Sequence, residues 1–96
     1  MGKIEMDIGK QIKQVRLAHK LTQEQFGEIL GKSVSTIHGY ETNTITPPFE
    51  GLTTISSLFH ISIGDLMRLK SNNFDGISDL YSYYLELVGE EDEKKS

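Results

Sequence analysis

The segment at residues 22–41, TQEQFGEILGKSVSTIHGYE, carries the pattern that decides the fold. Thr22 is suited to cap the N-terminus of a helix, and Gln25, three residues later, completes a capping box. Phe26 and Leu30 then fall on one face at helical spacing. The pattern therefore predicts a short amphipathic helix that begins directly after Thr22.

A second short helix is expected across a tight turn. Gly31 can take the left-handed conformation that ends a helix without a steric penalty, and Ser33 is suited to cap the next helix. Ile37 and Tyr40 give that next helix one apolar face. Gly27 lies inside the first helix, where a glycine costs about 1 kcal/mol relative to alanine. A small residue is expected there if the second helix crosses close to it.

This pattern resembles the helix-turn-helix of the phage repressor and Cro family, also called Xre-like. The resemblance covers residues 8–69 and is carried by Gln23, Phe26, Gly27, Leu30, Gly31, Ser33, Ser35, Thr36, Ile37, Tyr40 and Glu41. It implies an all-α chain with a five-helix, lambda-repressor-like DNA-binding domain over residues 7–70. The helix-turn-helix motif itself would occupy residues 22–41.

The other helices of this domain are predicted from apolar periodicity and capping residues. Asp7 is expected to cap a first helix that runs to about His19. Thr46 is expected to cap a fourth helix, with two prolines in its first turn. Ser62 and Asp65 resemble a further capping box, which would open the fifth helix.

The C-terminal part of the chain is predicted to add one amphipathic helix. Residues 71–76 are polar and rich in turn formers, so they read as a linker, and residues 90–96 as a disordered acidic tail. The helix between them, residues 77–89, has an apolar stripe of Ile77, Leu80, Tyr81, Tyr84, Leu85 and Val88. This stripe can pack on its own domain, on a second copy or on a partner protein. A homodimer interface is favoured, because the five-helix domain closes its core without it.

The charge is unevenly distributed along the chain. The net charge is −4, but residues 1–70 hold eight basic and seven acidic side chains, whereas residues 71–96 hold two and seven. The acidity therefore lies in the C-terminal part. A basic patch is the usual footprint of a nucleic-acid-binding domain. Affinity for DNA is thus expected to depend on a few well-placed charges and on backbone amides at helix N-termini.

Several kinds of chemistry are not expected from this sequence. It has no cysteine, and His19, His38 and His60 do not follow a metal-ligand spacing, so we expect no metal. The sequence suggests no Ser-His-Asp or paired-carboxylate arrangement and no phosphate-binding glycine loop, so we expect no enzyme and no cofactor. No apolar run approaches the ~18 residues of a membrane span, and the N-terminus is too polar for a signal peptide. The expected location is cytoplasmic, without membrane contact.

The resemblance also implies which residues meet DNA. In the family, the helix that starts near Ser33 lies in the major groove with its first residues at the base edges. The candidates for base contact are Lys32, Ser33, Val34, Ser35, His38 and Gly39. Val34 and Gly39 stand where relatives often carry Arg or Gln, so Val34 would pack on a thymine methyl and Gly39 would allow close backbone approach. Specificity should therefore depend on methyl contact, DNA shape and dimer spacing.

Contacts to the DNA backbone are expected from neighbouring segments. Gln23, at the start of the second helix, is the main phosphate candidate. The other candidates are Thr36, Lys13, Asn43 and Thr44. For Lys13 a simple solvated position is an equal alternative. Arg16 and Glu41 are expected, from the resemblance, to form a structural ion pair between the first and third helices.

The sequence therefore predicts a sequence-specific DNA-binding transcriptional regulator. The favoured form is a repressor that binds a palindromic operator as a homodimer through residues 33–41. The alternative is a protein-interaction module, antitoxin-like or regulator-binding, on the same scaffold with weak DNA binding. The missing cations after Glu41, the glycine at position 39 and the acidic tail favour this alternative.

Overall fold

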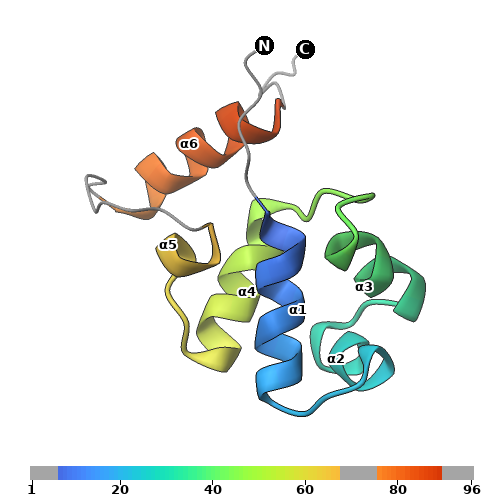
Figure 1. The fold of residues 1–96 in the computed structure, drawn as a ribbon. Helices are drawn as coiled ribbons and strands as arrows, with labels where there is room; N and C mark the ends of the chain where they lie inside the picture. Colours follow the sequence, from blue (N-terminus) through green and yellow to red (C-terminus); the bar gives the residue numbers. More distant parts are fainter. Residues whose placement is uncertain (1–6, 68–75, 90–96) are drawn as a thin grey trace.

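Six α-helices make up the part of the chain that the computed structural model describes, residues 7–67 and 76–89. They are α1 (Ile8–Ala18), α2 (Gln23–Leu30), α3 (Val34–Glu41), α4 (Phe49–Phe59), α5 (Ile63–Leu66) and α6 (Ile77–Val88). Figure 1 shows α1 in the middle, with α2 and α3 on one side, α4 and α5 on the other, and α6 above α4 and α5. The predicted all-α class with five helices and a C-terminal helix is confirmed. The predicted disordered tail and most of the predicted linker lie outside the described residues.

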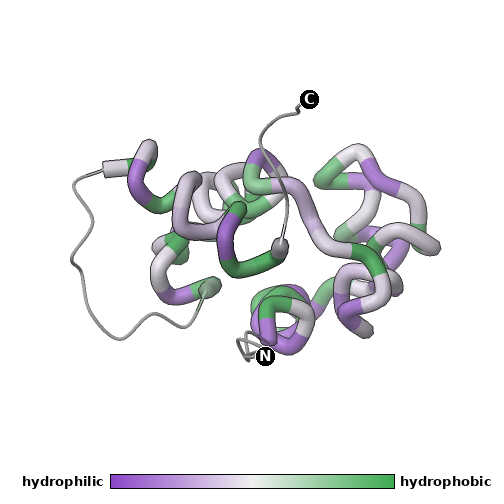
Figure 2. Tube along the Cα trace, turned by 90° about the horizontal axis from the view of Figure 1, so that it is seen from above, coloured by the Kyte–Doolittle hydropathy of each residue, from purple (hydrophilic) through white to green (hydrophobic). Residues whose placement is uncertain are grey.

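The core draws apolar side chains from every helix. Its fully buried members are Ile12, Phe26, Ile37, Leu52, Ile55, Leu66 and Tyr84. Removal of this apolar surface from water is the main stabilising term of such a fold. Figure 2 views α1 along its axis, and its hydrophobic side faces the other helices. Tyr40 is also a core residue, and burial raises the pKa of its phenol.

The helix starts follow the predicted caps, with one exception. Asp7, Ser33 and Ser62 accept backbone N–H groups in the first turns of α1, α3 and α5. The prediction that Thr46 caps the fourth helix is wrong, because α4 begins at Phe49 and its N-cap residue is Pro48. A residue that precedes a proline is disfavoured in the α region, so the two consecutive prolines delay the start of the helix.

Helix α6 packs on its own domain through Tyr84, which the sequence had placed in a dimer interface. The Tyr84 side chain is 1% exposed and its hydroxyl donates a hydrogen bond to the Pro47 carbonyl. Its ring centroid lies 5.7 Å from that of Phe49. The α3–α4 loop supplies the hydrogen-bond acceptor and the first residue of α4 supplies the aromatic ring, so Tyr84 finds both partners on its own domain. Of the predicted stripe, Leu80, Leu85 and Val88 are half-buried, whereas Ile77 and Tyr81 are exposed.

The end of α4 offers a test of backbone strain. His60 follows the helix in the left-handed region at φ 58°, which costs an L-residue other than Gly or Asn roughly 1–2 kcal/mol. We expect His60→Gly to raise the free energy of unfolding by about 0.5–1 kcal/mol, after the entropic cost of glycine. Urea unfolding followed by circular dichroism measures the change.

The matched control is Gly31→Ala at the end of α2. Gly31 has φ 73° and open space around its missing side chain, so only the backbone conformation is tested. We expect this variant to be less stable by about 1 kcal/mol. Equal stability of both variants and the unsubstituted protein would contradict the strain argument.

Candidate nucleic-acid interface

The turn between α2 and α3 folds closely over the end of α2. Gly31 is left-handed at φ 73°, and the Lys32 N–H donates to the Gly27 carbonyl over 2.7 Å. A Cβ atom on Gly27 would lie 2.5 Å from the Lys32 carbonyl oxygen and 3.5 Å from Ile37 Cγ1. Gly27 is therefore required mainly by the backbone of the turn, and less by α3, which the sequence had suggested as the close neighbour.

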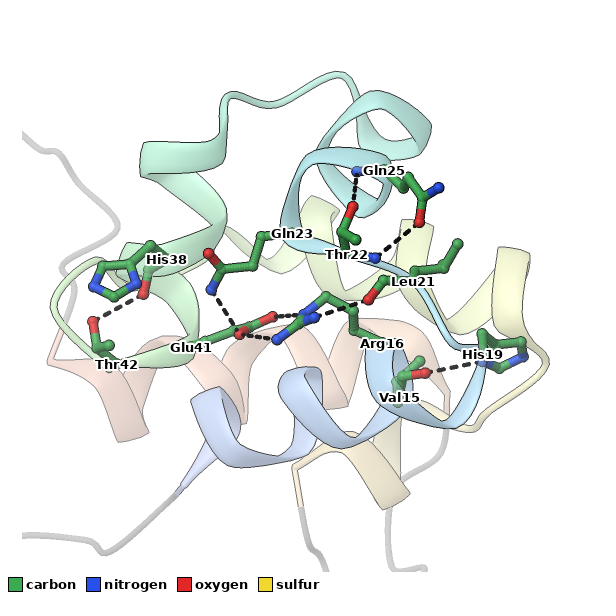
Figure 3. A network of polar contacts seen from close by, with 10 residues as sticks. All are labelled: Val15, Arg16, His19, Leu21, Thr22, Gln23, Gln25, His38, Glu41 and Thr42. Atoms are coloured by element: carbon green, nitrogen blue, oxygen red, sulfur yellow. Dashed lines mark hydrogen bonds and ion pairs between the residues drawn. The ribbon is translucent and has the colours of Figure 1, made fainter.

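A buried ion pair joins α1 to the end of α3. Arg16 Nε donates to Glu41 Oε2 over 2.6 Å, and Arg16 Nη2 donates to Glu41 Oε1 over 3.0 Å. Arg16 Nη1 also donates to the Leu21 carbonyl at 2.8 Å, so the guanidinium holds the α1–α2 turn as well (Figure 3). Both residues are buried, at 8% and 9% exposed. The structure thus brings together the two residues expected to pair, with the two-pronged geometry that only Arg provides.

Gln23 belongs to the same network. Its side-chain amide nitrogen donates to Glu41 Oε1 over 3.1 Å, as Figure 3 shows. The sequence assigned Gln23 to phosphate binding, but in the structure its donor is directed into the protein. A buried carboxylate needs several donors to offset its desolvation, and Gln23 supplies one of them.

Five of the six predicted base-contacting residues are exposed around the start of α3. They are Lys32, Ser33, Val34, Ser35 and His38. Ser33 Oγ accepts the Thr36 N–H at 3.1 Å and donates to Thr36 Oγ1 at 3.0 Å, so both side chains are held at the helix start. Thr36, a predicted phosphate contact, is half-buried. The exposed surface therefore offers a cation, hydroxyl groups, an imidazole and a branched apolar group.

Gly39 is the exception, because the loop after α3 covers it. The Thr44 and Ile45 N–H groups both donate to the Gly39 carbonyl, over 2.9 and 3.0 Å. A Cβ atom on Gly39 would lie 2.4 Å from Ile45 Cδ1. Gly39 is therefore buried beneath Ile45, contrary to the expectation that it is open to close approach of the backbone. Sequence reasoning missed Ile45, since a loop residue has no periodicity that would reveal its contact.

Asn43 also differs from its predicted phosphate role. It is left-handed at φ 61°, its Oδ1 accepts the Gly9 N–H at 3.0 Å, and its Nδ2 donates to Asp7 Oδ1 at 3.1 Å. Both ends of the amide are thus used to hold the start of α1 against the end of α3. The fit is close, because a Cβ atom on Gly9 would lie 2.5 Å from the Tyr40 carbonyl oxygen.

Two predicted phosphate contacts remain at the surface. Lys13 is exposed on α1, one turn before Arg16. Thr44 is exposed in the α3–α4 loop, where its hydroxyl lies 2.8 Å from that of Thr42. Both can meet an anion without rearrangement of the backbone.

The described residues show no sign of a metal site or a membrane segment. Within residues 7–67 and 76–89, no three or more His, Cys, Asp or Glu side chains are grouped so as to hold a metal ion. Over the same ranges, no helix is both long and apolar enough to cross a lipid bilayer.

Two helices joined by a tight turn, with the second helix exposed along its outer face, define a helix-turn-helix protein. The helix-turn-helix family model matches residues 12–66, and the chain belongs to this family. The resemblance seen in the sequence is therefore confirmed. Relatives and a solved structure extend this result.

The uncharacterized HTH-type transcriptional regulator YobD of Bacillus subtilis is 35% identical over 60 residues, which are 62% of this chain and 54% of YobD. Antitoxin PezA of Streptococcus pneumoniae is 37% identical over 60 residues, or 62% of this chain and 38% of PezA. This chain thus matches about half of one relative and less of the other. The crystal structure of a transcriptional regulator from Listeria innocua has the same fold, with a TM-score of 0.65 at 23% identity over 95% of this chain and 84% of that one.

The ion pair gives a direct test of what holds α3 in place. In Arg16→Ala, the Glu41 carboxylate stays buried without its main partner, so we expect a loss of about 3 kcal/mol in the free energy of unfolding. Urea unfolding measures this loss. The control is the double variant Arg16→Met/Glu41→Leu, which replaces both charges by apolar groups and should lose less. A double variant as unstable as Arg16→Ala would show that packing, not the uncompensated charge, sets the cost.

Proposed function

We propose that the protein is a sequence-specific DNA-binding transcriptional regulator, and that α3 enters the major groove. The observation that carries this proposal is the set of exposed side chains at positions 32–35 and 38. They lie just before α3 and along it, and the opposite face of this helix is fixed by the core and the ion pair. An eight-residue helix is ~12 Å long, and the major groove is ~12 Å wide. The whole outer face of α3 can therefore lie within the groove.

Contacts to phosphate would come from the segments that flank α3. Lys13 on α1, Lys32 in the turn and Thr44 in the following loop are all exposed. The N-terminal end of α2 adds backbone N–H groups and the positive end of a helix dipole. This is a small number of cations, so the base contacts and a second protein copy must supply much of the affinity.

We further propose repression by a homodimer on a two-fold symmetric operator, with half-sites about 34 Å apart. The burial of Tyr84 leaves Ile77 and Tyr81 on α6 exposed, at 56% and 42%. Tyr81 also forms part of the wall of a cleft of about 260 Å³, whose other lining residues are Thr46, Pro47, Pro48, Phe49, Tyr84, Leu85 and Val88. An apolar strip next to an apolar cleft suits a symmetric contact, in which each α6 strip meets the cleft of the other copy.

A protein-interaction module is the second candidate function. It is favoured by the near-neutral charge of residues 1–70 and by the similarity of this domain to part of an antitoxin. In that case the same α6 strip would bind a different protein. The two functions differ in their dependence on DNA.

DNA binding is tested with the full chain on a random duplex at two salt concentrations, and on sites selected from random DNA. We expect affinity to fall steeply with salt, because phosphate contacts release counterions. Val34→Asp should lower the affinity at least tenfold, since it places a carboxylate against the groove.

The charge-matched control for this experiment is Ser57→Asp, at an exposed position on α4. It should bind like the unsubstituted protein. No measurable binding at low salt would count against the regulator and favour the interaction module. Equal loss in both variants would show that net charge alone, and not α3, governs binding.

The dimer is tested by a substitution on the exposed strip. Ile77→Asp should shift the protein to a monomer in sedimentation, because it buries a charge at the proposed contact. The helix itself should persist, since an acidic residue is favourable in a first turn. Ser82→Asp, exposed on another side of α6, should leave the dimer intact. A monomeric unsubstituted protein, or a dimeric Ile77→Asp variant, would refute this interface.

A further inference from the structure

We propose that Ile45, a residue of the α3–α4 loop, completes the base-reading surface of α3 and contacts the C5-methyl group of a thymine. This inference rests on the proposed DNA binding and names one determinant of its sequence preference. Ile45 would act at the place on α3 where Gly39 has no side chain.

The position of Ile45 follows from the geometry of α3. Gly39 comes four residues after Ser35, so the two residues point to the same face of the helix, one turn apart. Ser35 is exposed on that face. The space in front of Gly39 is filled by Ile45, whose Cδ1, Cγ1 and Cβ would lie 2.4, 2.6 and 3.1 Å from a Cβ atom on Gly39. Ile45 therefore stands on the outer face of α3, one turn beyond Ser35.

The Ile45 side chain is held in place before any ligand arrives. The Thr44 and Ile45 N–H groups both donate to the Gly39 carbonyl. The Thr42 hydroxyl donates to the His38 carbonyl over 2.9 Å, which fixes the first residue of the loop. A β-branched side chain also has few rotamers to lose. The Ile45 side chain therefore loses little conformational entropy when it contacts DNA, so more of the contact energy contributes to the binding affinity.

The exposed part of the Ile45 side chain is available to contact a ligand, in addition to covering Gly39. Although it packs on α3, Ile45 remains 42% exposed, close to the 44% of Val34 near the start of the same helix. Exposed apolar groups thus lie near both ends of α3, Val34 in its first turn and Ile45 over Gly39 in its last turn. In the major groove, the thymine methyl is the apolar feature that a base pair presents. Val34 and Ile45 are therefore suited to read two different thymines.

The experiment starts from a site selected from random DNA with the full chain. Each thymine of the site is replaced in turn by deoxyuridine, which removes only the C5-methyl group. With the unsubstituted protein, we expect one thymine per half-site to lose about fourfold in affinity through its contact with Ile45, the effect of one buried methyl group. In Ile45→Ala this loss should disappear at that thymine alone.

Two further variants make the result specific. Val34→Ala should abolish the methyl effect at a different thymine and keep the one assigned to Ile45. Ile45→Thr keeps the β-branch above Gly39, so it decides the question if Ile45→Ala fails to fold. It should weaken the methyl effect at the same thymine.

The outcomes separate this inference from the proposed function. A selected site at which no methyl effect depends on residue 45 would overturn the role of Ile45 and leave DNA binding standing. Failure to enrich any site would overturn the proposed DNA binding itself.

Discussion

The paired hydrogen bonds between the Arg16 guanidinium and the Glu41 carboxylate are the constraint on which the exposed surface depends. They connect the last turn of α1 to the last residue of α3, and the third donor of Arg16 fixes the turn before α2. One side chain therefore holds the end of α1, the turn that follows it and the distant end of α3. A buried pair of this kind adds little net stability relative to apolar packing, but it requires one arrangement of its partners. The consequence here is a single orientation for the outer face of α3.

The α3–α4 loop is the second organising feature, since it meets three helices. Asn43 holds the start of α1, Ile45 covers Gly39 on α3, and the Pro47 carbonyl accepts the hydroxyl of Tyr84 on α6. The loop has no Lys or Arg, and its Asn43 amide and its Thr44 and Ile45 N–H groups bond within the protein. Its contribution to a ligand is therefore shape and apolar contact more than charge.

The sequence predicted those features that local chemistry determines. The capping residues Thr22 and Ser33 and the left-handed Gly31 act within a few residues of themselves, so their patterns identified the helix-turn-helix. The differences arose where partners are distant. Asn43 binds Gly9 across 34 positions, and Tyr84 binds Pro47 across 37, and no periodicity reports such contacts. The burial of Gly39 was missed for the same reason, because Ile45, which covers it, belongs to a loop.

The attachment of α6 makes the domain modular. Tyr84 of α6 contacts the Pro47 carbonyl and the Phe49 ring. Both lie within residues 12–66, the segment that the family model matches, whereas α6 lies beyond it. The five-helix unit thus provides the binding site for one tyrosine of an added helix. A different C-terminal segment with a tyrosine at the equivalent place could be grafted there, bringing a new assembly state or sensor while α3 keeps its shape. Recombination in the laboratory could then exchange the C-terminal helix while the five-helix unit stays the same.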